Sequence, residues 1–148
     1  MARADEYPKQ PVVGVGGVVI ADDRALLIRR GAEPLRGQWS IPGGRLELGE
    51  SIAEGVRREM LEETGLEVRV LDLIEVFERV FHDDDGRLRY HYVILDYLCE
   101  ALAGTPRPGG DVTDVAFATE DELARYNLTP TATRVLLKGF ALARARQR

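Results

Sequence analysis

The segment over residues 44–66, GRLELGESIAEGVRREMLEETGL, constrains the fold of this chain more than any other. It predicts an amphipathic helix over residues 51–64, because Ser51 can cap the first turn and Glu54 follows at the spacing of a capping box. Gly65 stands where helices commonly end in the left-handed conformation. Local sequence therefore fixes both ends of one helix, and the rest of the chain must be arranged around it.

Three carboxylates recur on one side of this predicted helix. Glu59, Glu62 and Glu63 are spaced i, i+3 and i+4, so they lie within about a quarter of the helix circumference. The adjoining arc carries Ile52 and Met60, which must face the core. Like charges this close repel one another, whereas a hard cation prefers oxygen ligands grouped in this way. The cluster predicts a divalent-metal site, although a solvated helix with i, i+4 salt bridges is an alternative that it leaves open.

The remaining sequence is rich in β-branched and aromatic runs separated by turn residues, which favours a mixed α/β domain. No repeat or linker divides it, so residues 1–148 are expected to form one domain, with a frayed N-terminus over residues 1–10. We expect loops over residues 31–37 and 104–110, strands over residues 12–20, 25–29, 39–41, 66–81 and 88–98, and helices over residues 120–126 and 131–146.

Composition excludes several classes of protein. The net charge of −5 argues against binding of long nucleic acid through a basic face. Cys99 is the single cysteine, so no internal disulfide can form and a reducing compartment is expected. Residues 1–11 lack the apolar core of a signal peptide, and no apolar run approaches the roughly 18 residues that a membrane span needs. A cytoplasmic protein without a membrane partner is predicted.

Glycines in the first predicted strand superficially suggest a dinucleotide-binding turn, Gly14-x-Gly16-Gly17. That motif requires a helix directly after the glycines, whereas these lie inside a continuous strand pattern. We interpret them as positions where another backbone or a ligand approaches closely.

The spacing of fixed residues in the segment over residues 44–66 resembles the Nudix box at every defined position. Those positions are Gly44, Glu50, Arg58, Glu59, Met60 as the aliphatic residue, Glu62, Glu63, Gly65 and Leu66. A chance match is expected about once in 10⁹ start points at ordinary residue frequencies. Residues 12–142 as a whole are similar to short bacterial Nudix hydrolases. The resemblance implies a Nudix α/β/α sandwich with a mixed β-sheet, in which the box forms a loop–helix–loop.

The resemblance also implies roles for individual residues. Metal ligands would be Glu59, Glu62, Glu63 and the carbonyl group of Gly44, with Mg²⁺ as the cofactor and Mn²⁺ as a substitute. Catalytic roles would fall to Glu59, to Arg58, which holds a catalytic glutamate in place, and to Glu50 as the partner of Arg58. The reaction would be attack of water on a diphosphate phosphorus, and bound cations would reverse the local negative charge.

The general base stays open at this point. Glu59 is one candidate, because the family varies in this role. A carboxylate on a loop outside the box is the alternative, and the sequence offers Asp111, Asp114, Glu120 and Asp121.

The resemblance favours hydrolysis of ADP-ribose or a similar nucleotide sugar to AMP and a sugar phosphate, because residues 90–99 and 122–125 look like compact members with that activity. A proline that marks many such enzymes is absent, since none lies between Leu66 and Thr105. The alternatives are a mutator-type (d)NTP pyrophosphohydrolase that releases pyrophosphate and, more remotely, a nucleotide-sensing module. The partner would be a small nucleotide, and a homodimer is possible. Substrate-binding candidates are Trp39, Arg30, Phe81 and Tyr92, with core packing as the alternative for the aromatic residues.

Overall fold

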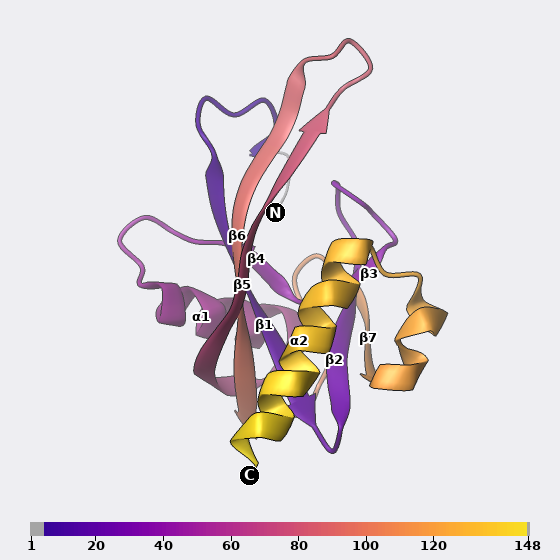
Figure 1. The fold of residues 1–148 in the computed structure, drawn as a ribbon. Helices are drawn as coiled ribbons and strands as arrows, with labels where there is room; N and C mark the ends of the chain where they lie inside the picture. Colours follow the sequence, from indigo (N-terminus) through magenta and orange to yellow (C-terminus); the bar gives the residue numbers. More distant parts are fainter. Residues whose placement is uncertain (1–4, 148) are drawn as a thin grey trace.

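The computed structural model describes residues 5–147 and places a seven-stranded sheet between two α-helices (Figure 1). This arrangement confirms the predicted α/β/α sandwich with a mixed sheet. The elements are β1 (Val12–Ala21), β2 (Arg24–Arg30), β3 (Trp39–Ser40), β4 (Gly43–Arg45), α1 (Ile52–Thr64), β5 (Glu67–His82), β6 (Leu88–Ala103), β7 (Val112–Thr119), the 3-10 helix η2 (Glu120–Tyr126) and α2 (Pro130–Arg146).

Strand β1 is the centre of the sheet, and its two ends have different neighbours. It runs parallel to β6, from Val12 opposite Tyr92 to Val19 opposite Cys99. On its other side it pairs antiparallel with β4 and, at its last residues, with β2. The glycines of β1 allow close approach, because a Cβ at Gly17 would lie 2.8 Å from the Sδ atom of Met60 on α1. At Gly16 a Cβ would lie 2.9 Å from the Pro42 backbone carbonyl oxygen, which confirms the expected approach of another backbone at that glycine, whereas the neighbours of Gly17 are side chains.

Two apolar clusters fix the helices on opposite sides of the sheet. On one side, Val56 and Met60 of α1 are fully buried against β1 and β6. On the other side, Val135 and Leu136 of α2 are buried in a cluster with Val18. Both helices therefore stand on the sheet through their own apolar stripes, which leaves the polar face of α1 free to build a site.

Local sequence fixes the turns and helix ends as predicted. Ser51 caps α1, since its Oγ atom accepts a hydrogen bond from the Glu54 N–H at 3.1 Å. Gly65 ends α1 with φ 74°. The β1–β2 turn places Asp22 and Asp23 at positive φ, the conformation that a tight hairpin requires.

Several expectations are corrected. Residues 112–119 form strand β7, which pairs with β2 along its whole length and was not predicted. Strand β6 runs on to Ala103, and Gly43–Arg45 forms a strand of its own. The described part of the N-terminal segment is held in place, because Asp5 accepts a hydrogen bond from Arg45 and the Tyr7 N–H donates to the Arg89 carbonyl. The expectation of fraying is wrong there, while residues 1–4 lie outside the described residues.

Two smaller points follow from burial and helix length. Cys99 is buried, as expected for a small apolar residue. Within residues 5–147 there is no helix with both the length and the apolar character that a bilayer crossing demands.

Candidate active site

The pairing of β4 with β1 holds two glycines against the polar edge of α1. The Gly43 N–H donates a hydrogen bond to the Glu63 Oε1 atom at 2.9 Å. A Cβ at Gly44 would lie 2.3 Å from the Glu59 carboxyl group, so only glycine leaves room for that carboxylate. The two glycines therefore position these two glutamates of the box, one by a hydrogen bond and one by leaving space.

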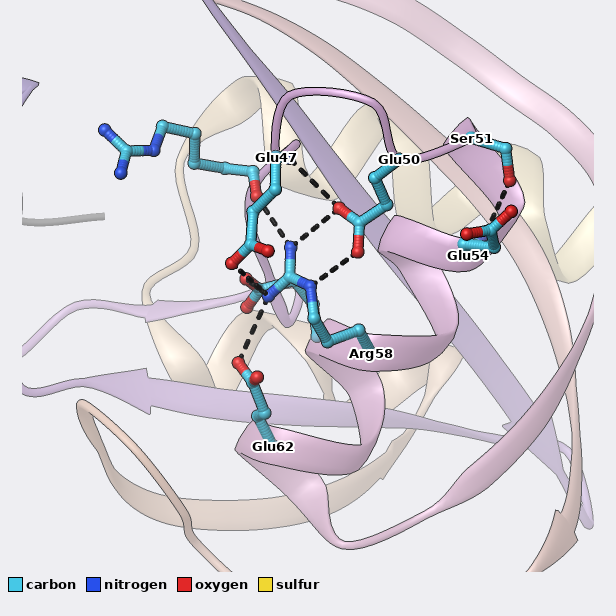
Figure 2. A network of polar contacts seen from close by, with 8 residues as sticks. Glu47, Glu50, Ser51, Glu54, Arg58 and Glu62 are labelled. Atoms are coloured by element: carbon cyan, nitrogen blue, oxygen red, sulfur yellow. Dashed lines mark hydrogen bonds and ion pairs between the residues drawn. The ribbon is translucent and has the colours of Figure 1, made fainter.

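Arg58 lies at the centre of a network of carboxylates, shown in Figure 2. It binds Glu50 through two hydrogen bonds, of 2.7 Å from Nε and 3.0 Å from Nη2. Its Nη1 atom donates to Glu59 at 2.7 Å and to Glu62 at 3.2 Å. Glu54 takes no part in this network among the described residues, so only the Arg58–Glu62 half of an i, i+4 ladder is present. The expected pairing of Arg58 with Glu50 is present.

The same arginine connects the helix to the loop before it. Its Nη2 atom donates to the Arg45 carbonyl at 2.9 Å, and the Glu50 Oε1 atom accepts from the Glu47 N–H at 3.0 Å. Hydrogen bonding to Arg58 lowers the pKa of Glu50. These contacts hold the loop, the helix and the Glu59 carboxylate in one arrangement.

Glu59 is buried and Glu63 is half-buried, and the pKa of each carboxyl group is raised. Burial, together with the neighbouring charge of Glu59, raises the pKa of Glu63 to about 7, although the hydrogen bond from Gly43 opposes the shift. Burial also raises the pKa of Glu59, although Arg58 opposes the shift. The Glu59 and Glu63 carboxyl groups disfavour each other's negative charge. A cation bound to them would favour the ionised form of both.

Glu62 differs from the other two glutamates. Its side chain is 56% exposed and is directed to Arg58. Within residues 5–147, no three acidic, histidine or cysteine side chains converge as a ready-made metal site. The expectation that all three helix glutamates converge is therefore corrected, because Arg58 draws Glu62 to the outside of the helix.

Arg30 and Asp111 lie near Glu63. All three line one hollow, together with Gly31. Arg30 is a half-buried cation whose pKa is lowered by desolvation, and its Nε atom donates to the Pro34 carbonyl at 2.7 Å. The structure therefore places one substrate-binding candidate and one candidate base beside the box.

The other candidate bases lie in different surroundings. Asp114 is exposed on β7 and pairs with Arg29 at 3.8 Å. Glu120 begins η2 and accepts a hydrogen bond from Arg144 at 2.9 Å. Asp121 is exposed on η2. None of these three lines the hollow that contains Glu63.

The aromatic candidates pack mainly against protein. Tyr92 is 2% exposed and stacks on Tyr90, so its expected contact with substrate is wrong. The reason is its position on β6 opposite Val12, with its hydroxyl directed to Asp5. Trp39 lies edge-on to Tyr126 and Phe81 lies edge-on to Tyr90, and each is half-buried.

Sequence reasoning missed three residues that line another hollow beside Gly43. They are Phe77 and Arg79 on β5 and Asp96 on β6. The available signal was Asp96, a carboxylate in the middle of an otherwise apolar strand sequence, YHYVILDYLC. An isolated charge in a buried strand is costly and calls for an explanation.

Comparison with known proteins agrees with this geometry. The profile of the family described as NUDIX domain matches residues 10–138. An ADP-ribose pyrophosphatase of Methanocaldococcus jannaschii is 34% identical over 72% of this chain, which spans 61% of that protein. A MutT-like protein of Streptomyces ambofaciens is 34% identical over 92% of this chain and 83% of its own length.

Two further proteins place the chain in the same family. The nucleoside triphosphatase NudI of Escherichia coli K12 is 33% identical, with 82% of this chain and 84% of that protein covered. The crystal structure of a MutT NUDIX hydrolase from Burkholderia pseudomallei aligns with a TM-score of 0.76 at 30% identity, over 88% of this chain and 98% of that one. The chain therefore belongs to the Nudix hydrolase family.

Proposed function

We propose that this enzyme hydrolyses the diphosphate linkage of ADP-ribose or a similar nucleotide sugar, giving AMP and a sugar phosphate, with Mg²⁺ as its cofactor and Mn²⁺ as a substitute. The observation that carries the hydrolytic part is the pair of carboxyl groups of the buried Glu59 and the half-buried Glu63, which lie against two glycines beside the cationic Arg30. This pair offers oxygen ligands to a hard cation next to a group that can bind phosphate.

The residues that would hold the cation are Glu59, Glu63 and the Gly44 carbonyl group, with Glu62 joining if it leaves Arg58. A bound divalent cation neutralises developing charge on the phosphate and lowers the pKa of the attacking water. Arg58 acts as a positioning residue, since its hydrogen bond fixes the rotamer of Glu59. Arg30 is placed to bind phosphate oxygens, and the general base is Glu59 or the nearby Asp111.

Similarity supports ADP-ribose as the substrate, since the ADP-ribose pyrophosphatase of M. jannaschii is among the relatives at 34% identity. The second candidate is a (d)NTP that is cleaved to a nucleotide and pyrophosphate. It is favoured by the MutT-like protein and NudI, which are as similar and are covered over more of their own length. The metal site itself treats both substrates alike, because each presents a diphosphate.

A substrate panel tests the proposal. We would compare kcat/KM for ADP-ribose, other nucleotide sugars, the dNTPs and 8-oxo-dGTP at one Mg²⁺ concentration, and identify the products by chromatography. The expected result is a preference for ADP-ribose with AMP as a product, and loss of all turnover in EDTA. A triphosphate preferred by about tenfold or more, with pyrophosphate released, would replace the ADP-ribose proposal with the second candidate. Full turnover in EDTA would overturn the metal mechanism.

A further inference from the structure

The hollow beside Gly43 is an open cavity lined by both apolar and charged residues. It lies between β1, β5, β6 and the first turn of α2, with about 410 Å³ of empty space that includes its open mouth. Most of its walls are apolar, formed by Val15, Ile41, Pro42, Phe77, Ile94 and Ala132. Its charged groups are Arg30, Arg79 and Asp96. Apolar walls with a few polar groups are typical of small-molecule sites.

Asp96 is a buried carboxyl group without a protein partner. Its residue is only 3% exposed, and among residues 5–147 it forms neither a hydrogen bond nor an ion pair. Burial raises its pKa to about 7, although the charge of Arg79 opposes the shift. Among the described residues the Tyr90 hydroxyl is the one fully buried side-chain polar atom without a hydrogen-bond partner, so the Asp96 oxygens are accessible from the hollow and can accept a hydrogen bond from a ligand there.

The neighbouring strand leaves space for this carboxyl group. A Cβ at Gly16 would lie 2.3 Å from the Asp96 Oδ1 atom and 2.9 Å from the Pro42 carbonyl oxygen. Glycine inside a strand weakens the strand, which makes its use here informative. Any side chain at Gly16 would therefore occupy the space of the Asp96 carboxyl group.

Arg79 completes the charged end of the hollow. Burial lowers its pKa, and the like charge of Arg30 lowers it further. Its guanidinium lies 5.8 Å from the centre of the Phe77 ring, but within the described chain it has no ion pair or hydrogen bond. Arg79 and Asp96 line the same hollow and form no ion pair with each other, so a ligand in the hollow can meet both a donor and an acceptor.

We infer that Asp96 and Arg79 select the base of the substrate, with Asp96 accepting a hydrogen bond from an exocyclic amino group and Arg79 donating to the adjacent ring nitrogen. Adenine offers this pair of groups on one edge. An oxo base such as hypoxanthine would set a carbonyl oxygen against Asp96, which is an acceptor only when it is ionised, so the discrimination is expected above the pKa of Asp96. The inference rests on the proposed function, because Gly43 lines this hollow and its N–H donates a hydrogen bond to Glu63, and the inference requires a nucleotide whose phosphates lie at Glu63.

The test compares amino and oxo bases on the same diphosphate. We would measure kcat/KM for ADP-ribose and for its hypoxanthine analogue, and for dATP against dITP if triphosphates prove to be the substrates. The wild-type enzyme should favour adenine by about tenfold or more, because the wrong base leaves a buried carboxylate unsatisfied. Asp96→Asn should bring the ratio close to one, since its amide can also donate to a carbonyl group.

The controls separate base selection from folding. Asp72→Asn makes the same chemical change at an exposed aspartate on β5 that pairs with Arg146, and it should keep the wild-type ratio. If Asp96→Asn does not fold, Arg79→Gln supplies the second variant and should also reduce the preference for adenine. A ratio within each variant is insensitive to the amount of folded enzyme, which is why it is the deciding readout.

Binding of the nucleoside monophosphates AMP and IMP to the metal-free wild-type protein, followed by calorimetry, separates this inference from the proposed function. Tighter binding of AMP than IMP supports the inference even if neither ADP-ribose nor any triphosphate is hydrolysed. Equal treatment of the two bases by the wild type would overturn it, as would an unchanged ratio in Asp96→Asn. Sensitivity to changes in the ribose instead of the base would assign Asp96 to the sugar and also overturn it.

Discussion

The charged Nudix-box side chains of α1 are paired with other protein groups, whereas within residues 5–147 two charged side chains of the hollow beside Gly43, Asp96 and Arg79, are not. On α1, the Arg58 guanidinium donates hydrogen bonds to three carboxylates and a backbone carbonyl group and forms an ion pair with a fourth carboxylate, Glu47, at 3.7 Å. In the hollow, Asp96 and Arg79 contact no charged partner among the described residues. The first set is complete before any substrate arrives, whereas the second is complete only with a ligand. The residues of α1 therefore hold the catalytic groups in place before substrate binds, whereas the residues of the hollow select the substrate.

Replacement of Glu63 on α1 by Gln is expected to have the largest effect on activity. The change keeps the volume of the Glu63 side chain but removes the negative charge that would bind a cation. We expect kcat to fall by about 10²-fold or more, because a metal ligand acts directly on the transition state. Steady-state kinetics at saturating Mg²⁺ measures the effect.

Glu67→Gln is the matched control for this variant, since Glu67 is exposed at the start of β5, just beyond the helix. It should retain the wild-type rate. A normal rate for Glu63→Gln, in a protein with an unchanged circular dichroism spectrum, would contradict the role of Glu63 as a metal ligand.

Arg58→Gln tests whether the completed network positions the glutamates. The variant loses the double hydrogen bond to Glu50 and the bond to Glu59, so the Glu59 carboxylate is no longer fixed. We expect kcat to fall about 10- to 100-fold while KM stays nearly constant. Arg58→Lys should recover little of the lost kcat, because an ammonium group cannot form the two parallel hydrogen bonds that the planar guanidinium makes to Glu50.

The adjacent arginine provides the control for this effect. Arg57 lies on the same helix, is exposed, and belongs to no ion pair among the described residues. Arg57→Gln should therefore leave kcat unchanged. If Arg58→Gln instead raises KM and leaves kcat intact, Arg58 contacts the substrate and its assignment as a positioning residue is wrong.

The ends of α1 and the Arg58–Glu50 pair could be predicted from sequence because they depend on residues close together in the chain. The cap at Ser51, the end at Gly65 and the Arg58–Glu50 pair all lie within residues 44–66, where helix geometry converts spacing into position. Glu62 was misjudged because helix geometry places a side chain on an arc but does not say which neighbour it will bind.

The hollow could not be predicted because it depends on pairing between distant strands. Asp96 reaches it only because β6 runs parallel to β1, which sets Asp96 opposite Gly16. Strand β7 was missed for a related reason. Its sequence, VTDVAFAT, has a short and interrupted apolar pattern, and its long antiparallel pairing with β2 stabilises it as a strand.

The smallest expected effect concerns Glu120 and sharpens the distinction between paired and unpaired carboxylates. Its ion pair with Arg144 has side chains 40% and 52% exposed. An exposed pair contributes at most about 1 kcal/mol, so Glu120→Gln should change the free energy of unfolding by less than that in chemical denaturation. Its kcat should stay within about threefold of the wild-type value, whereas Asp111→Asn should lower kcat more, because Asp111 shares a hollow with Glu63. A loss of about 100-fold in Glu120→Gln, with Asp111→Asn unaffected, would instead make Glu120 the general base. The Arg144 pair would then be a resting position that Glu120 leaves when substrate binds.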